Sequence, residues 1–408
     1  MNGQNPILRI VSGMVCLLFL FNSCTTENEY TSIEPEEEQT EEETPGDLSS
    51  VIDTYFGNAV DFENLENYAN QNIPNYITKD NTGSNPITDA KATLGRILFY
   101  DKNLSVDNSV SCASCHKQAF AFGDIADVSQ GVNGVTGRHS MRLVNSRFAD
   151  EVRFFWDKRA NSLEEQTTQP IQDHAEMGFS GQNGDPFLND LLIKLSNTDY
   201  YPAIFQHIYG DTQITEERLQ ESLAQFIRSI QSFDSRFDQG LAQTNDLNQD
   251  FTNFTTQENQ GKRLFLDPPN QGGAGCMGCH RAPEFDIDPQ SRNNGIIGVF
   301  GNAAMTDITV TRSPSLRDIF NPNGMLNGNL MHDASKNSVV EVVEHYNAID
   351  ASGNANLDNR LRGAPGENGQ QLNLSSADIQ ALDAFIRTLT GNAMYADERW
   401  SDPFVENQ

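Results

Sequence analysis

The chain has 408 residues, with 27 Lys and Arg against 57 Asp and Glu, which gives a formal net charge of −30. At about 100–200 residues per domain, this length suffices for two domains with separate cores. A hydrophobic fraction of 37% is enough for globular packing and excludes wholesale disorder. The strong negative charge argues against any role in binding the phosphate backbone of nucleic acids.

Residues 1–23 have the pattern of a lipoprotein signal. Arg9 precedes an uninterrupted, mostly apolar run, Ile10–Phe21, which has the length of a signal-peptide core and is too short to span a bilayer. Ser23 and Cys24 follow, and a small residue before Cys is typical of bacterial lipoproteins. We expect Cys24 to be lipidated, with ordinary secretory cleavage nearby as the alternative. Either process exports the protein to the cell envelope.

The next segment, residues 24–50, is expected to be an acidic tether. Ten acidic side chains and no Lys or Arg lie between Thr25 and Asp47. Like charges at this density repel one another, and the segment has no apolar pattern from which to build a core. We therefore expect a solvated linker between a lipid anchor in the membrane and the folded part of the chain.

Two Cys-x-x-Cys-His motifs, Cys112–His116 and Cys276–His280, use every cysteine beyond Cys24. This motif attaches c-type haem: the two thiols bond to the haem vinyl groups, and the adjacent imidazole reaches the iron. A zinc site built from four thiols, or a pair of redox disulfides, would leave the two trailing histidines unexplained. The sequence therefore predicts two covalently bound haem c groups. The expected cofactor-binding residues are Cys112, Cys115, His116, Cys276, Cys279 and His280.

The two motifs belong to a weak internal repeat. Gly95–Asp101 precedes the first motif, and the similar Gly261–Asp267 precedes the second at nearly the same distance along the chain. Each unit closes with a helical pattern. The first helix is expected after Thr215 as N-cap, and the second after the capping box Ser375–Asp378, with Gly391 as its stop.

Strand signals are few, so we predict a mostly α protein. Each repeat unit has a helix, a haem-attachment loop, a long irregular stretch and a closing helix, which is the plan of a small c-type cytochrome. The predicted organisation is two c-type cytochrome-like haem domains in tandem, 51–240 and 241–408, behind the signal and the tether.

At this level of detail the sequence resembles the bacterial di-haem cytochrome c peroxidases and their relatives of the MauG type. The resemblance covers roughly residues 85–395, and both the order and the spacing of the motifs agree with the family. Besides the haem motifs, the segments that carry it are Phe155–Ala160, Leu163–Gln166, Pro170, Glu176–Gly178, Tyr201–Phe205, Ser235–Asp238 and Met331–Asp333.

The resemblance implies that the haem at His116 reacts with peroxide and that the haem at His280 passes electrons to it. A peroxidase also needs a base that takes a proton from H₂O₂ and returns it to the leaving oxygen. Glu176 matches the family's acid/base, and an apolar pocket would raise its pKa toward neutrality. Gln166 is expected to hydrogen-bond the peroxide. Trp156 matches a tryptophan between the haems and is expected to relay electrons, a role compatible with simple core packing.

The first departure from the family concerns the peroxide-reacting iron. Many of these peroxidases close that iron with a histidine on a loop until the other haem is reduced. Counting back from His139, the corresponding residue in this chain is Val132, which cannot ligate iron. We therefore predict a site that is open at rest, unless His139 or His174 closes it.

The second departure concerns the other iron. Fourteen positions beyond His332, where the peroxidases have an axial Met, this chain has Tyr346, as the MauG branch does. A phenolate stabilises ferric iron and would lower the potential relative to Met. His345 and Met331 are the alternative ligands, and a core position on a helix is the alternative role for Tyr346.

The resemblance further implies a Ca²⁺ held by an Asn side chain and two backbone carbonyls. The Asn position aligns with His139, and the carbonyls would come from Asn327 and Asn329. Imidazole is a poor ligand for this hard cation, which weakens the case for calcium.

The sequence thus predicts an exported, periplasmic di-haem cytochrome c peroxidase that reduces H₂O₂ with electrons from a small donor such as a cytochrome c. One alternative is a MauG-like enzyme that oxidises Trp or Tyr side chains of a partner protein. The other is a non-catalytic di-haem electron carrier. The family often dimerises, so a homodimer is also consistent with the resemblance.

Overall fold

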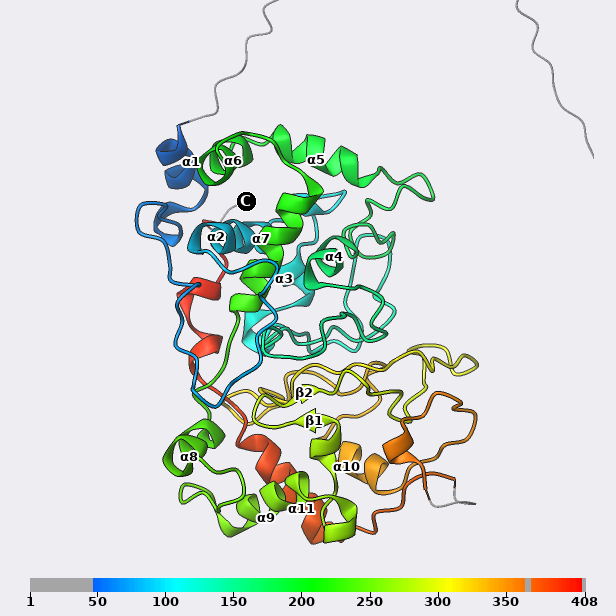
Figure 1. Ribbon diagram of the computed structural model, residues 1–408. Helices are drawn as coiled ribbons and strands as arrows, with labels where there is room; N and C mark the ends of the chain where they lie inside the picture. Colours follow the sequence, from blue (N-terminus) through cyan, green and yellow to red (C-terminus); the bar gives the residue numbers. More distant parts are fainter. Residues whose placement is uncertain (1–46, 364–367, 406–408) are drawn as a thin grey trace, which may run out of the picture. The chain divides into compact units, whose positions relative to one another are not determined.

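The computed structural model describes residues 47–363 and 368–405 (Figure 1). The signal, Cys24 and the tether up to residue 46 lie outside the described residues. Helix α1 (Leu48–Tyr55) begins just after Asp47, whose carboxylate accepts a hydrogen bond from the backbone N–H of Ser50. Helical structure therefore starts three residues before the boundary expected at residue 51. Within the described ranges, no helix is both long enough and apolar enough to cross a bilayer.

Two pairs of packed helices form the framework (Figure 1). Helix α2 (Asp89–Tyr100) packs against α7 (Glu216–Ser229), and α9 (Thr256–Leu266) packs against α11 (Ser376–Arg387). Each of the two C-x-x-C-H motifs follows the first helix of its pair. The internal repeat seen in the sequence thus corresponds to a repeated helix pair.

The repeated glycine of each unit lies where the two helices of a pair cross. A Cβ added to Gly95 would lie 2.0 Å from the carbonyl oxygen of Ser222, and one added to Gly261 would lie 1.8 Å from that of Ala381. Both distances are far below van der Waals contact, so any side chain larger than hydrogen would force the helices apart. This close approach is the physical reason for the repeated glycine.

The predicted closing helices are confirmed with their caps. The Thr215 side chain accepts a hydrogen bond from the N–H of Arg218, and Ser375 forms a capping box with Asp378. The second helix ends at Arg387, four residues before the expected stop at Gly391. Gly391 instead makes a close contact, since its added Cβ would lie 2.2 Å from the hydroxyl oxygen of Ser232.

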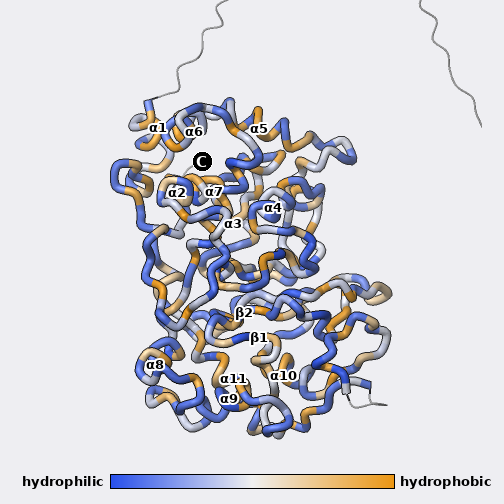
Figure 2. The backbone as a smooth tube through the Cα atoms, in the orientation of Figure 1, coloured by the Kyte–Doolittle hydropathy of each residue, from blue (hydrophilic) through white to orange (hydrophobic). Residues whose placement is uncertain are grey.

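The described residues contain two large hydrophobic cores. The first is built on α2 and α7, which Figure 2 shows with hydrophobic stretches, and the second on α9 and α11. Trp400, near the end of the chain, returns to the first core, where its indole N–H donates to the Ser229 hydroxyl at 3.2 Å. The second core is rich in phenylalanine and includes Phe237, Phe251, Phe254, Phe265, Phe285 and Phe385.

The predicted mostly α class is confirmed for the described residues. Their one sheet pairs β1 (His280–Arg281) with β2 (Asp286–Ile287) in antiparallel register, His280 opposite Ile287. The other helices are α3 (Cys112–Cys115), α4 (Leu163–Thr168), α5 (Leu188–Ser196), α6 (Tyr201–Tyr209), α8 (Arg236–Thr244) and α10 (Val339–Asn347). Short 3₁₀ helices are η1 (Gly57–Ala59), η2 (Lys102–Leu104), η3 (Gln118–Phe120), η4 (Pro269–Gln271), η5 (Cys276–Gly278), η6 (Asn359–Leu361), η7 (Ala393–Tyr395) and η8 (Glu398–Trp400).

Candidate haem sites and active site

The first motif forms a single helical turn, α3, that leads directly into its histidine. The N–H of His116 donates to the Cys112 carbonyl at 2.9 Å, and the imidazole Nδ1–H donates to the Phe122 carbonyl at 3.0 Å. This second bond fixes the tautomer and leaves Nε2 as a neutral ligand. Burial raises the pKa of Cys112 to about 12 and that of Cys115 to about 11, while it lowers the pKa of His116.

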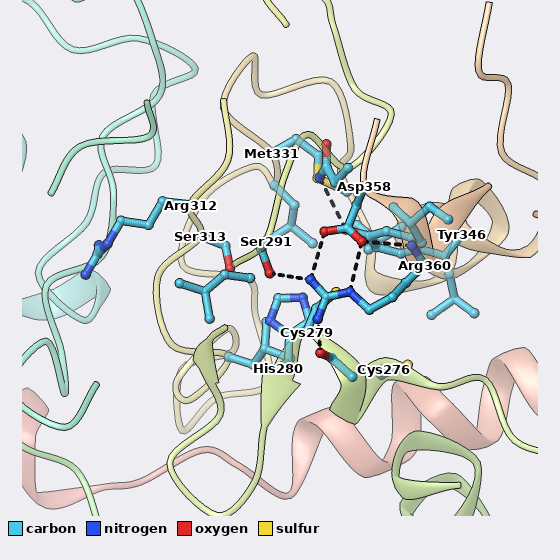
Figure 3. Close-up of a pocket in the computed structure, with 18 of the residues that line it drawn as sticks. Cys276, Cys279, His280, Ser291, Arg312, Ser313, Met331, Tyr346, Asp358 and Arg360 are labelled. Atoms are coloured by element: carbon cyan, nitrogen blue, oxygen red, sulfur yellow. Dashed lines mark hydrogen bonds and ion pairs between the residues drawn. The ribbon is translucent and has the colours of Figure 1, made fainter. Parts of the chain in front are cut away.

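The second motif lines a cavity of about 500 Å³, here called the His280 cavity (Figure 3). Cys276 is the first residue of η5, Cys279 directly follows η5, and His280 is the first residue of β1. Apolar side chains including Leu316, Ile319 and Val343 form much of the wall. Burial raises the pKa of Cys276 to about 12 and lowers that of His280 to about 4. The Nδ1 atom of His280 is buried, with no hydrogen-bond partner among the described residues.

These residues fit a c-type haem better than the alternatives. The thiols of Cys112, Cys115, Cys276 and Cys279 are free rather than paired in disulfides. In residues 47–363 and 368–405, no group of three or more His, Cys, Asp or Glu is arranged to hold a metal ion. At the second motif, two thiols and a neutral imidazole beside a largely apolar cavity match the groups that attach and ligate a haem, and the first motif supplies the same three groups.

Tyr346 and Met331, two candidates for the sixth ligand of the iron at His280, both line the His280 cavity. Both also accept hydrogen bonds from the same residue. The Asn294 amide donates to the Tyr346 hydroxyl at 3.2 Å and to the Met331 sulfur at 3.4 Å. Burial raises the pKa of Tyr346. The third candidate, His345, is not among the lining residues, and its Nε2 donates to the Asn294 carbonyl at 2.9 Å. Asn294 carried no signal in the sequence because its role depends on contacts with residues far from it in the chain.

Glu176 lies in a smaller cavity of about 280 Å³, here called the Glu176 cavity. Burial and the nearby Asp173 carboxylate raise the pKa of Glu176 to about 7, and the Arg159 guanidinium acts in the opposite direction. Asp173 also shapes the turn, because its carboxylate accepts hydrogen bonds from the N–H groups of Ala175 at 2.8 Å and Glu176 at 3.1 Å. The pKa of the Glu176 carboxyl therefore lies near neutral pH, as an acid/base catalyst requires.

Gln166 is half-buried on α4 and is not among the residues that line the Glu176 cavity. Gln169 and Gln172, about one and two turns later, do line it. Neither glutamine was singled out in the sequence. They follow Gln166 at intervals of three residues, and this near-helical spacing is the sequence signal that could have identified them as neighbours of one site.

Val132 and Glu176 are neighbours in the structure. The N–H of Val132 donates to the Glu176 carbonyl at 3.0 Å, and the N–H of Asn133 donates to the Ala175 carbonyl at 3.2 Å. The Val132 side chain is half-buried against the first core. The residue aligned with the closing histidine of other peroxidases is thus apolar and adjoins the candidate acid/base.

The two histidines that could close this site, His139 and His174, each make hydrogen bonds through Nδ1. His174 is paired through Nδ1 with the Asp185 carboxylate at 2.8 Å. His139 is 5% exposed, and its Nδ1–H donates to the carbonyls of Ala126 at 3.0 Å and Asp127 at 3.2 Å. Each ring uses Nδ1 in these contacts, so the hydrogen bonds alone do not decide whether Nε2 of either ring reaches the iron.

The His139 side chain does not supply the side-chain oxygen ligand that the resemblance implied for a calcium ion. The Nδ1–H of the imidazole donates to main-chain carbonyls, and the side chain has no oxygen atom that could coordinate calcium. The nearby Asp127 carboxylate accepts from the Asn329 amide at 2.6 Å, and the Asn327 amide donates to the Asp318 carbonyl at 2.9 Å.

Trp156 joins segments that belong to the two halves of the sequence. Its indole N–H donates to the His139 carbonyl at 2.8 Å, and its ring centroid lies 6.3 Å from that of His332. Its carbonyl accepts from the N–H groups of Thr311 at 2.9 Å and Arg312 at 3.0 Å. Trp156 also lines the His280 cavity, so it borders one of the two candidate haem sites directly.

Comparisons with known proteins agree with this geometry. The family model for di-haem cytochrome c peroxidase matches residues 89–246. The methylamine utilization protein MauG of Methylorubrum extorquens is 30% identical over 273 residues, which cover 64% of this chain and 70% of that protein. The cytochrome c551 peroxidase of Nitrosomonas europaea is 27% identical over 315 residues, covering 74% and 80%. The solved structure of a MauG-like protein associated with microbial copper homeostasis matches with a TM-score of 0.62 and 27% identity, covering 82% of this chain and 99% of that one.

Proposed function

The chain belongs to the di-haem cytochrome c peroxidase family, and from this premise we propose that it reduces hydrogen peroxide to water with electrons from a small redox protein. The observation that carries the proposal is the half-buried Glu176 carboxyl, which lies beside the apolar Val132 and has a pKa raised to about 7. The reaction consumes one H₂O₂, two electrons and two protons and releases two waters.

Two haems, attached at Cys112–Cys115 and Cys276–Cys279, would supply the iron centres for peroxide reduction and for electron entry. His116 and His280 would each give a neutral ring nitrogen to an iron, and Tyr346 is proposed as the second ligand on the His280 side. The hydrogen bond from His116 to Phe122 keeps its ring in the orientation that this ligation needs.

Glu176 is proposed to move the protons. Its carboxylate takes a proton from the incoming peroxide, and the resulting acid returns it to the oxygen that leaves as water. Gln166 is proposed to hydrogen-bond the peroxide, with Gln169 and Gln172 as further donors because they share the cavity with Glu176. Trp156 is proposed to relay electrons between the two halves, supported by its position against His139, Thr311 and Arg312.

We place the protein in the periplasm, anchored by a lipid on Cys24 through the acidic tether. The small donor would be a cytochrome c or a protein of similar size. A basic surface on that donor would suit the net charge of −30, since opposite charges accelerate association. A homodimer is compatible with this proposal.

A MauG-like oxidation of Trp or Tyr side chains on a partner protein is the second candidate. Tyr346 in the wall of the His280 cavity favours it, because a phenolate ligand stabilises ferric iron and disfavours rapid electron entry from a donor. A non-catalytic electron carrier is disfavoured, since a carrier gains nothing from a titratable carboxyl in a cavity beside an apolar residue.

Stopped-flow spectroscopy of the resting diferric protein distinguishes the three candidate functions: peroxidase, MauG-like oxidase and electron carrier. Peroxidase activity predicts fast, peroxide-dependent oxidation of a reduced small cytochrome c that is lost in Glu176→Gln. The MauG-like alternative predicts a rapid spectral response to peroxide but slow cytochrome oxidation, with modified Trp or Tyr in a partner detected by mass spectrometry. A protein that gives no spectral response to peroxide would be a carrier.

A further inference from the structure

Two arginines in the wall of the His280 cavity are buried without a carboxylate partner. Arg142 and Arg312 are 8% and 7% exposed, and both line the cavity. The best contact of Arg142 is a 3.3 Å bond from Nη2 to the Ser315 carbonyl, and that of Arg312 is 3.3 Å from Nη1 to the Met141 sulfur, a weak acceptor. The Nε–H group of each has no partner among the described residues.

Other buried arginines of the described chain have strong acceptors. They pair with a carboxylate or with main-chain oxygens: Arg96 with Ser401 and Ala59, Arg147 with Asp80, Arg228 with Glu164, and Arg317 with Asp238. Burial lowers the pKa of both Arg142 and Arg312 to about 10, so both are still charged at neutral pH. Asp318 attracts Arg142 from a distance, as Glu151 and Asp286 attract Arg312, but neither guanidinium forms an ion pair with a described carboxylate. A buried charge without a directly paired counter-ion is unfavourable, which indicates that an anion belongs beside them.

The two side chains lie between the haem-attachment motifs. Arg142 packs on the loop that follows His116, since a Cβ added to Gly123 would lie 2.9 Å from its Cγ. The N–H of Arg312 donates to the Trp156 carbonyl, and its guanidinium lies 4.6 Å from the Phe154 ring. In Figure 3, Arg312 extends away from Cys279 and His280, and no dashed line reaches it.

Arg360 in the same cavity makes the contrast clear. Figure 3 joins its guanidinium by dashed lines to neighbouring residues, and it contacts the carboxylates of Asp358 at 2.8 Å and Asp288 at 2.7 Å. Its charge is therefore neutralised within the protein. Among the described residues, the buried charges in this cavity wall that lack such neutralisation are those of Arg142 and Arg312.

We propose that Arg142 and Arg312 bind carboxylate side chains of the haems at the junction between the two sites. A haem is an apolar macrocycle with two carboxylate groups, and the cavity pairs an apolar wall with two unmatched guanidinium groups. Guanidinium binds carboxylate through two parallel hydrogen bonds, which also orients it. The inference rests on the haem attachment within the proposed function. The carboxylates come from the haem at Cys276–Cys279 or from the one at Cys112–Cys115.

Such pairing would set the redox potential of the haem concerned. The reduced iron carries one positive charge fewer than the oxidised iron, so a buried positive charge nearby favours the reduced form. The guanidinium also compensates the negative charge of the carboxylate. Removing either guanidinium is therefore expected to lower the midpoint potential. Arg142 and Arg312 act here as positioning residues rather than as catalytic ones.

The test is spectroelectrochemical titration of both haems in the haem-loaded protein with Arg142→Gln or Arg312→Gln. The potential of one haem should fall in each variant, and the haem that responds identifies the source of the carboxylate. Arg142→Lys and Arg312→Lys, which keep the charge, should restore most of the potential. Arg263→Gln is the control, because Arg263 is exposed on α9 and does not line this cavity, and it should leave both potentials unchanged.

Unchanged potentials of both haems in fully loaded Gln variants would overturn the proposal. A crystal structure of the haem-loaded wild-type protein tests it without any variant, because guanidinium nitrogens within hydrogen-bond distance of a haem carboxylate are expected. Guanidinium groups that contact only main chain or solvent would refute it. Neither measurement uses peroxide turnover, so a failure of the proposed enzymatic function would be recognised separately.

Discussion

The backbone N–H of Val132 donates a hydrogen bond to the carbonyl oxygen of Glu176 across 3.0 Å. These residues are far apart in the chain, and the bond brings the apolar substitute for a closing histidine next to the candidate acid/base. The same loops are joined again by the bond from Asn133 to Ala175. An open iron site and a proton-transferring carboxyl would therefore depend on one pair of loops.

Glu176→Gln tests the proton-transfer role. Glutamine keeps the size of the side chain but cannot take a proton, so the reaction of the resting protein with H₂O₂ should slow by about 10²–10⁴-fold. Stopped-flow absorbance measures this rate. Glu217→Gln, which changes an exposed glutamate at the start of α7, should react like the wild type. Equal rates in Glu176→Gln and the control would show that another group moves the proton.

The charges around Glu176 predict opposite pH shifts in two variants. Because the carboxylate form is the base, the peroxide rate should rise with pH through about 7. Asp173→Asn removes a charge that raises the pKa of Glu176, so the rise should move to lower pH. Arg159→Gln removes a charge that lowers this pKa, so the rise should move to higher pH.

The amide introduced by Asp173→Asn retains an acceptor for the turn that Asp173 stabilises, whereas Asp173→Ala removes both the charge and the acceptor. We expect Asp173→Ala to shift the profile in the same direction as Asp173→Asn and also to lower its plateau. A rate profile that moves in the same direction in Asp173→Asn and Arg159→Gln would contradict the electrostatic explanation.

Val132→His tests whether this position controls access to the iron. An imidazole beside Glu176 is expected to become a sixth ligand of the haem at His116, which would convert its resting EPR signal from high spin to low spin. Val132→Leu, which keeps an apolar side chain, should leave the high-spin signal in place. Two low-spin haems in the wild-type protein would show that the site is already closed.

Tyr346→Phe and Met331→Leu distinguish the oxygen and sulfur ligand candidates that share Asn294. If Tyr346 ligates the iron, its replacement by Phe should change the EPR signal of the haem at His280 and raise its potential, since an anionic ligand is lost. Met331→Leu should then have little effect on either measurement. The reverse pattern would assign the iron to Met331.

Gly95→Ala and Gly261→Ala test the repeated helix crossing. The added methyl groups would overlap the carbonyl oxygens of Ser222 and Ala381, so each variant should lose about 1–3 kcal/mol of unfolding free energy or more. Thermal and denaturant unfolding measure the loss. Gly83→Ala is the control, because an added Cβ at Gly83 has no neighbour within 4 Å. Stability equal to the control would mean that the helices can separate at no cost.

The parts of the protein that the sequence determined by itself are those set by short spacings. The C-x-x-C-H motifs place two thiols and an imidazole within one turn, and the N-caps Thr215 and Ser375 act on backbone groups three residues away. Glu176 was identified by resemblance, and the structure supplies the burial and the neighbouring Asp173 that hold its pKa near 7. The end of α11 at Arg387 instead of Gly391 shows the limit even for helices, because Gly391 serves close packing against Ser232 rather than the helix end.

Only the tertiary structure decided which distant residues meet. It paired Val132 with Glu176, brought Gln169 and Gln172 rather than Gln166 into the Glu176 cavity, and joined Tyr346 to Met331 through Asn294. Arg142 and Arg312 look like ordinary arginines in the sequence, and their missing partners emerge only when the chain is folded around them. The physical reason is that hydrogen bonds and burial between residues far apart depend on how whole helices and loops pack, which no local pattern encodes.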